Sequence, residues 1–201
     1  MTINSMLKTL LYFIIALNTF QSSPVFAQQP DSVKKAIAVG DDAPSFVLKD
    51  LSGEYIFLRD YTGKQLRQPW KNKEKHVVVL SFFATWCVPC RTEIPILGEI
   101  AARYTDEPLL IYLVDLEEKA AKIVPFIEEL NVSIPVLLDE YGVVAKKYGM
   151  VSEKDNVAAL PQLFLIDKEG TIRYLSRGLK DAEEFRSSLM TNIDTWLNVE
   201  N

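Results

Sequence analysis

The chain has 201 residues, of which 48% are hydrophobic, and a formal net charge of -5 at pH 7. This composition is typical of a globular protein with one sizeable core, and it excludes a disordered or fibrous chain. The acidic balance, without a long run of basic residues, shows no sign of the basic patch that nucleic-acid-binding proteins carry. We therefore expect no nucleic-acid partner.

Residues 1–27 have the pattern of an export signal. Lys8 is their only charged residue, residues 10–17 are apolar, and a small-x-small sequence ends at Ala27. The apolar run is shorter than the roughly 20 residues that span a bilayer. We predict cleavage after Ala27 and a periplasmic or other extracytoplasmic location, with an uncleaved membrane anchor as the alternative. Residues 28–39 are expected to form a linker, and residues 40–201 the folded domain.

Hydrophobic periodicity predicts alternating strands and helices after residue 40. Alternation on either side of Ser52 and Gly53 indicates a β-hairpin of residues 46–48 and 55–57. Continuous apolar runs indicate buried strands, and helical spacing indicates amphipathic helices, one of them with a kink at Pro95 and one capped by Asp181. The remaining predicted strands are 76–83, 109–114, 135–138, 162–166 and 171–175, and the predicted helices are 88–104, 117–130, 140–148 and 181–197. This order predicts parallel strands with helical crossovers, followed by antiparallel strands.

Three acidic residues, Asp115, Glu117 and Glu118, follow the second continuous apolar strand. Contact with a partner is one interpretation of this group. The alternative, which we expect, is a solvated start of the next helix, because acidic residues are favourable near a helix N-terminus.

The only two cysteines lie together, in the sequence Trp86-Cys87-Val88-Pro89-Cys90, between a predicted buried strand and a predicted helix. Unpaired N–H groups and the helix dipole favour a thiolate at a helix start. A disulfide across two residues closes too short a loop to stabilise the fold much. Two cysteines and one histidine also fall short of the four ligands of a zinc site. The pair is therefore predicted to be a redox dithiol, and we expect no metal or cofactor.

Four motifs lie at defined separations around the dithiol. They are Gly-Asp-x-Ala-Pro-x-Phe at 40–46, the segment 82–90, Glu93-Ile94-Pro95, and the segment 160–170 that begins Leu160-Pro161. In combination they resemble the thioredoxin-like superfamily, and more closely the exported thiol-disulfide oxidoreductases of the ResA/TlpA type, which are related to AhpC/TSA proteins. The resemblance covers residues 40–197. It implies a three-layer α/β/α fold with a central mixed sheet and an N-terminal β-hairpin extension.

The resemblance implies catalytic roles for three residues. Cys87 corresponds to an exposed attacking thiolate and Cys90 to a buried resolving thiol, and the two would form the redox disulfide. Glu93 matches an acidic residue that would handle protons near Cys90 if burial raised its pKa toward neutrality. An interaction with the helix dipole alone is the alternative for Glu93. Cytoplasmic thioredoxins have a buried Asp where this chain has Ser81, so Glu93 would have to supply its role.

The resemblance also implies substrate contacts. Pro161 corresponds to a cis-proline that faces the dithiol and leaves the backbone of Leu160 free to pair with an extended substrate. An ordinary trans proline is the alternative. Trp86 and Phe83 are candidates for the sides of a substrate groove, although aromatic residues here are as often part of the core. The polar residues 151–159 predict a longer loop than compact family members have.

The function predicted from these features is disulfide reduction in other exported proteins. Maturation of apocytochrome c is the substrate class that the resemblance implies, and an oxidising compartment requires a membrane thiol electron donor. A thiol peroxidase is one alternative, but the chain lacks the Pro-x-x-x-Thr-x-x-Cys pattern of peroxiredoxins. A copper-handling chaperone is another, although that function usually requires a CxxxC spacing and a distant partner histidine.

Overall fold

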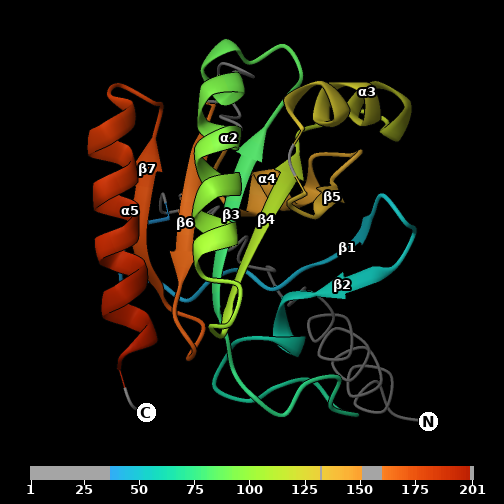
Figure 1. Cartoon of the computed structure of the whole chain (residues 1–201). Helices are drawn as coiled ribbons and strands as arrows, with labels where there is room; N and C mark the ends of the chain where they lie inside the picture. Colours follow the sequence, from blue (N-terminus) through green and yellow to red (C-terminus); the bar gives the residue numbers. More distant parts are fainter. Residues whose placement is uncertain (1–36, 132, 151–159, 200–201) are drawn as a thin grey trace, which may run out of the picture. The chain divides into compact units, whose positions relative to one another are not determined.

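The computed structural model describes residues 37–131, 133–150 and 160–199 (Figure 1). The predicted export signal, most of the predicted linker and the predicted loop 151–159 lie outside the described residues. None of the helices in the described ranges combines the length and the apolar character needed to cross a membrane.

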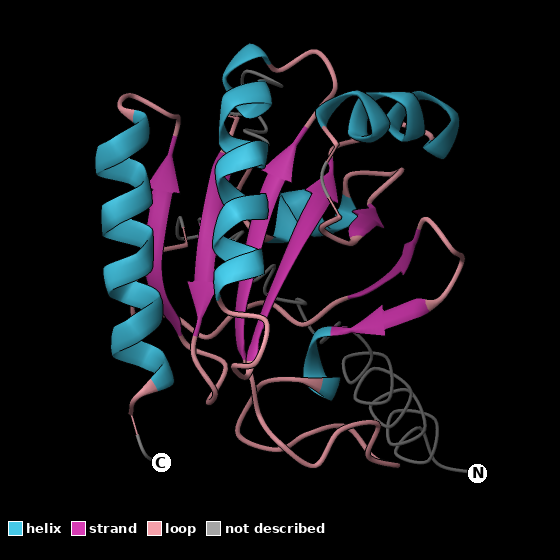
Figure 2. Cartoon of the chain, in the orientation of Figure 1, coloured by secondary structure: helices cyan, strands magenta, loops and turns pink. Residues whose placement is uncertain are grey.

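A mixed sheet of seven strands forms the centre of the described part, in the order β2-β1-β5-β4-β3-β6-β7 (Figures 1 and 2). Strands β3, β4 and β5 are parallel, and the other neighbouring strands are antiparallel. The predicted mixed sheet and its N-terminal hairpin are thus confirmed. The strands are β1 (Val47–Asp50), β2 (Tyr55–Phe57), β3 (Val77–Phe83), β4 (Leu109–Asp115), β5 (Val136–Leu138), β6 (Gln162–Ile166) and β7 (Ile172–Arg177).

Helices cover both faces of the sheet. The α-helices of the described residues are α2 (Val88–Arg103), α3 (Ala120–Leu130), α4 (Val143–Lys147) and α5 (Ala182–Leu197), and a 3-10 turn spans Leu58–Asp60. Ser81 of β3 contacts α2, whereas the next residue, Phe82, packs on Tyr148 at the end of α4. Successive strand residues point to opposite faces, so α2 and α4 lie on opposite sides of the sheet, as Figure 1 shows. This is the predicted α/β/α layering.

Two helices begin three residues later than the sequence predicts. Helix α3 begins at Ala120 rather than at 117, and α4 begins at Val143 rather than at 140. Glu117 has a φ of 58° and Gly142 a φ of 62°. These left-handed conformations cannot belong to a right-handed helix, so each helix begins only after them. Asp181, by contrast, caps α5 as predicted, because its side chain accepts the N–H of Glu184 at 2.7 Å.

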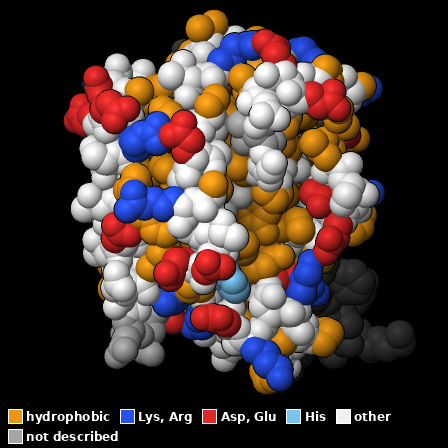
Figure 3. Space-filling view, in the orientation of Figure 1, with side chains coloured by type: hydrophobic (Ala, Val, Ile, Leu, Met, Phe, Trp, Pro, Cys, Tyr) orange, Lys and Arg blue, Asp and Glu red, His pale blue; other side chains and the backbone are white. Residues whose placement is uncertain are grey.

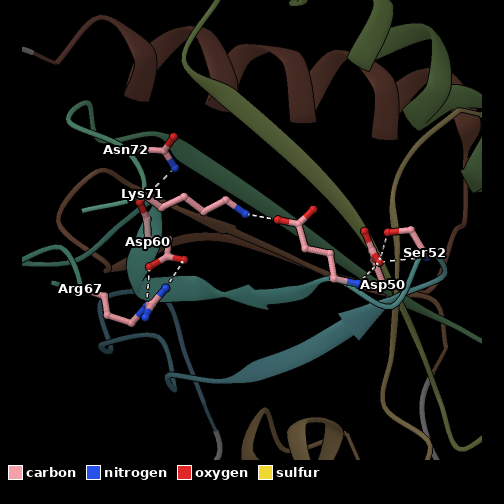
Figure 4. A network of polar contacts seen from close by, with 7 residues as sticks. Asp50, Ser52, Asp60, Arg67, Lys71 and Asn72 are labelled. Carbon is pink, nitrogen blue, oxygen red and sulfur yellow. Dashed lines mark hydrogen bonds and ion pairs between the residues drawn. The ribbon is translucent and has the colours of Figure 1, made fainter. Parts of the chain in front are cut away.

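Polar contacts stabilise the turn of the β1–β2 hairpin and the long loop that precedes β3 (Figure 4). Asp50 Oδ1 accepts the N–H of Ser52 at 2.9 Å and closes the hairpin turn. In the loop, the guanidinium of Arg67 donates to both carboxylate oxygens of Asp60, at 2.6 and 3.0 Å. This two-fold bond compensates the charge of Asp60, which is buried. This loop comes directly before β3, and the dithiol comes directly after β3. The loop and the dithiol therefore lie at opposite ends of that strand.

Hydrophobic side chains also reach the surface on the side of the sheet that carries α2 and α5. Figure 3 shows them beside α2 and below α3, with Lys, Arg, Asp and Glu side chains interspersed around them. Charges of both signs therefore share this face of the described part.

Truncation of Phe82 should destabilise the fold strongly. The side chain is fully buried, with ring centroids 5.4 Å from Tyr148 and 5.8 Å from Phe164. Phe82→Ala should lower the free energy of unfolding by about 3–5 kcal/mol, because a cavity is left between these rings. Urea unfolding checks this, with Tyr141→Ala, an 80% exposed aromatic residue, as the control expected to change stability by about 0.5 kcal/mol or less. Equal losses in the two variants would contradict the packing described above.

Candidate active site

Cys87 and Cys90 form a disulfide at the N-terminus of α2, with their Cα atoms 5.3 Å apart. Cys87 is the N-cap of the helix, and its Sγ accepts the backbone N–H of Cys90 at 3.2 Å. Pro89 lies in the first turn, where its missing N–H costs no helical hydrogen bond. The predicted place of the pair at a helix start is confirmed. After reduction, the same N–H group and the helix dipole favour a thiolate at Cys87.

The side chains around the dithiol differ from one another in exposure. Cys87 is only 3% exposed, so the expectation of an exposed Cys87 is wrong for the disulfide-bonded state, because the bond to the buried Cys90 holds its sulfur inward. Its neighbours Trp86 and Val88 are 60% and 75% exposed and form an apolar surface beside it. Phe83, the other aromatic residue considered for a substrate groove, is fully buried and belongs to the core.

Glu93 points into the protein, as the sequence predicts for a proton-handling residue. Its side chain is buried, and its Oε1 accepts the hydroxyl of Ser81 at 2.6 Å. Burial raises the pKa of Glu93 to about 7, although the hydrogen bond from Ser81 acts in the opposite direction. Glu93 and Cys90 are three residues apart on α2, a spacing that places side chains on the same helix face. Ser81 therefore contacts the carboxyl group that we expected to replace the Asp of cytoplasmic thioredoxins.

Leu160 and Pro161 lie at the end of the sheet that carries the dithiol. Strand β6 begins at Gln162, which pairs with Phe82 near the end of β3, and the dithiol follows β3. The Leu160–Pro161 peptide bond is cis, which confirms the prediction for this proline. Pro161 is buried and Leu160 is partly exposed. Together with the exposed Trp86, they are the described residues expected to contact a substrate.

Of the three acidic residues at the end of β4 and in the turn after it, Asp115 and Glu118 are buried and Glu117 is exposed. The expectation of a solvated helix start is therefore wrong for Asp115 and Glu118. Asp115 is fully buried and Glu118 is 7% exposed, because loop N–H groups and the side chain of Thr85 bind their carboxylates. Sequence reasoning missed Asp139, a buried residue whose Oδ2 accepts the N–H of Ala145 at 2.7 Å. Within the described ranges, no three His, Cys, Asp or Glu side chains are arranged to hold a metal ion.

Comparison with known proteins identifies the family. The sequence model of the AhpC/TSA family matches residues 39–175, which is more than half of the chain. The chain belongs to the AhpC/TSA family. It is 33% identical to the thiol-disulfide oxidoreductase ResA of Geobacillus thermodenitrificans over 156 residues. This alignment covers 78% of this chain and 79% of the relative. It is also 30% identical to ResA of Bacillus cereus over 158 residues, and this alignment covers 79% of this chain and 80% of the relative.

A comparison with solved structures agrees with this family assignment. A Chlorobium tepidum protein assigned as the thiol:disulfide interchange protein DsbE superimposes with a TM-score of 0.65 at 28% identity, over 81% of this chain and 99% of that protein. The predicted thioredoxin-like fold and enzyme class are therefore confirmed. The protein is a thiol-disulfide oxidoreductase of the AhpC/TSA family, and Cys87 and Cys90 are its CxxC pair.

Replacement of Glu93 by Gln should remove part of the pH dependence of stability. The pKa of Glu93 is about 7 in the folded state, against a usual value of 4.5. The folded state therefore binds more protons between these values, and the contribution of Glu93 to stability falls as the pH rises from about 4.5 to about 7. Gln cannot ionise, so the variant does not lose this contribution as the pH rises. Relative to the wild type, its free energy of unfolding should increase by about 3 kcal/mol across this range. Urea unfolding at about pH 4 and about pH 8 measures the difference.

Glu129→Gln serves as the control for this measurement. Its carboxylate is exposed and paired with Arg91, so its loss should change stability little at either pH. A difference between Glu93→Gln and the wild type that stays constant with pH would contradict a raised pKa for Glu93.

Proposed function

We propose that this oxidoreductase works outside the cytoplasm and reduces disulfide bonds in other exported proteins. The observation that carries the proposal is the buried Cys87–Cys90 disulfide at the start of α2, with Glu93 buried on the same helix. The pattern of residues 1–27 supports export by a cleaved signal, followed by the linker 28–39 and the working domain 40–201. Export supports a chemical role for the pair, because an oxidising compartment supplies disulfide substrates.

The proposed reaction starts from the reduced dithiol. The Cys87 thiolate attacks one sulfur of a substrate disulfide, which breaks that bond, forms a mixed disulfide and releases the other substrate sulfur as a thiolate. The Glu93 carboxylate then accepts the proton of Cys90. The Cys90 thiolate attacks Cys87, closes the Cys87–Cys90 disulfide and releases the second substrate sulfur. Two electrons have passed to the substrate, and its two thiolates take up two protons.

The pKa of Glu93 suits this proton transfer. A general base works best when its pKa lies near the pH at which it acts, and burial brings that of Glu93 to about 7. At its usual pKa of 4.5, the carboxylate of Glu93 would be a much weaker base. Because Glu93 and Cys90 share one face of α2, the proton would move within the interior rather than through the exposed surface.

The surface beside the dithiol supports a protein substrate. Trp86 and Val88 are exposed next to Cys87, and a large aromatic side chain can contact an extended chain that brings its disulfide to the buried sulfur. We assign Leu160 and Pro161, at the start of β6, to the opposite side of this contact. An apocytochrome c is the substrate that we propose first, on the ResA/TlpA resemblance. A membrane thiol electron donor would then reduce Cys87–Cys90 again.

The attacking role of Cys87 is tested by insulin reduction. The purified protein should accelerate the reduction of insulin by dithiothreitol, which is followed as turbidity. Cys87→Ser should return the rate to that of dithiothreitol alone, because serine cannot form a mixed disulfide. Full activity in Cys87→Ser would contradict the proposal. Peroxide consumption faster than that of a free thiol would favour the thiol peroxidase instead.

The substrate class is tested by trapping in the native host. Cys90→Ala should leave substrates bound to Cys87, because the second step, which releases them, needs the Cys90 thiol. Mass spectrometry of the adducts is expected to recover exported proteins, among them an apocytochrome c, and a membrane thiol protein. The Cys87→Ala/Cys90→Ala double variant is the control and should trap nothing. Adducts with cytoplasmic proteins alone would contradict the proposed location.

A further inference from the structure

Glu118 holds the loop that carries the dithiol. Its Oε2 accepts the backbone N–H of Thr85 at 2.6 Å, and its Oε1 accepts the Thr85 hydroxyl at 2.8 Å. Thr85 lies between β3 and α2, two residues before Cys87, whose own N–H donates to the carbonyl of Ala84 at 3.0 Å. Hydrogen bonds to a charged acceptor are stronger than bonds between neutral groups. The carboxylate therefore fixes the backbone just before the attacking sulfur.

Glu118 is itself held in place by the end of β4. The Oδ2 of Asp115 accepts the N–H of Glu118 at 3.0 Å, and the N–H of Leu116 donates to the carbonyl of Phe83 at 3.0 Å. Between them, Glu117 has a φ of 58°, a conformation that residues with a side chain rarely adopt. A continuous set of hydrogen bonds thus runs from β4 through this turn to the loop of the dithiol.

We propose that Glu118 and Asp115 are positioning residues for thiol–disulfide exchange. Glu118 acts through Thr85 on the backbone of the Cys87 loop, and Asp115 acts through Glu118 by fixing the turn that presents it. The proposal deepens the proposed function and rests on it, since both concern the same dithiol. Neither residue belongs to the motifs from which the family was predicted.

Asp115 makes this arrangement sensitive to protons. It is fully buried, and its Oδ1 has no hydrogen-bond partner in the described part of the chain. Burial, with a contribution from the negative charges of Glu118, Asp139 and Glu140, raises the pKa of Asp115 to about 7, although the N–H of Glu118 opposes this. The nearby positive charge, Lys122 of α3, is paired with Glu118. Ionisation of Asp115 therefore adds an uncompensated negative charge beside the carboxylate that holds Thr85.

The same side of the sheet also carries the second buried carboxyl group. Asp115 pairs in register with Phe83, two residues after Ser81, so their side chains point to the same face. Ser81 binds Glu93 of α2 on that face. The negative charges that act on Asp115 are those of Glu118, Asp139 and Glu140, so its ionisation adds a further negative charge to the group around this turn. The hydrogen-bonded turn that presents Glu118 is therefore expected to be more stable below about pH 7 than above it.

The positioning role is tested with the reduced wild-type protein and four variants. The readout is the rate of reaction of Cys87 with the small disulfide dithionitrobenzoate, together with the reduction potential against glutathione. Glu118→Ala should react about tenfold more slowly, because both bonds to Thr85 are lost. Glu118→Gln should stay within about threefold of the wild type, since an amide can accept the N–H of Thr85 and donate to its hydroxyl. Glu129→Ala, which removes an exposed carboxylate paired with Arg91, is the charge-matched control and should stay within about twofold.

Two outcomes of this comparison would overturn the proposal. One is a wild-type rate and potential in Glu118→Ala. The other is an equal decrease of the reaction rate in Glu118→Ala and Glu118→Gln. That result would show that the rate depends on the charge of Glu118 rather than on its hydrogen bonds. If Glu118→Ala does not fold, Thr85→Val replaces it and should be about threefold slower, and an unchanged rate there would overturn the proposal. A failure of the proposed function looks different, because the wild type itself would then not reduce insulin.

The proton dependence is tested with Asp115→Asn, the fourth variant. Asn keeps an oxygen for the N–H of Glu118 but cannot ionise. The ratio of the wild-type rate to the variant rate should be constant below about pH 6 and should fall as the pH rises through about 7. The titrations of Cys87 and Glu93 are common to both proteins and cancel in the ratio. A ratio that is constant over the whole range would overturn the role assigned to Asp115.

Discussion

The burial of β3 is the constraint on which the rest of the site depends. All seven residues of this strand, Val77–Phe83, are buried, and the strand is paired on one side with β4 and on the other with β6. Such a strand cannot shift along its neighbours without exposing apolar side chains and breaking two ladders of hydrogen bonds. The point at which it ends is therefore fixed, and with it the start of α2 and the position of the dithiol.

Each structural neighbour of β3 contributes residues to the site at the end of this strand. Helix α2, which follows the strand, brings Cys87 and Cys90 together with Glu93, whose carboxyl group is anchored on Ser81 of the strand itself. Strand β6 begins there with Gln162, immediately after Pro161. Strand β4 ends there and contributes the turn that binds the loop before the dithiol. The chemistry of the protein is thus assembled at one end of the sheet from three separate parts of the chain.

Two buried carboxyl groups set the electrostatics of this end of the sheet. Glu93 and Asp115 both have a pKa of about 7, in each case mainly because burial penalises the charged form. Buried ionisable groups reduce stability near neutral pH, and natural proteins tolerate them chiefly where a function requires them. The function that we propose for Glu93 is proton exchange with Cys90, and the function that we propose for Asp115 is the support of Glu118. In this proposal, one buried carboxyl group moves a proton at the dithiol, and the other supports the backbone that precedes it.

Several features of the fold could be predicted from sequence because they depend on local patterns. A continuous apolar run indicated β3, alternating apolar residues indicated the β1–β2 hairpin, and Asp181 was identified as the cap of α5 from its position alone. The starts of α3 and α4 were predicted three residues too early. The acidic residues there resemble a helix start in sequence, whereas Glu117 has a left-handed conformation and donates its N–H to the carbonyl of Asp139, a residue remote in the chain.

By itself, the sequence determined the family, the redox pair and the element order, since spacing and periodicity are written in neighbouring residues. Only the tertiary structure decided the environment of each carboxyl group. Glu93 and Asp115 are both acidic residues beside apolar segments, and nothing local shows that one binds Ser81 while the other keeps an unpartnered oxygen. Burial and hydrogen bonding depend on residues that are remote in the chain. For that reason the dithiol and Glu93 could be identified from the sequence, whereas the burial of Asp115 and Glu118 and the contacts of their carboxyl groups could not.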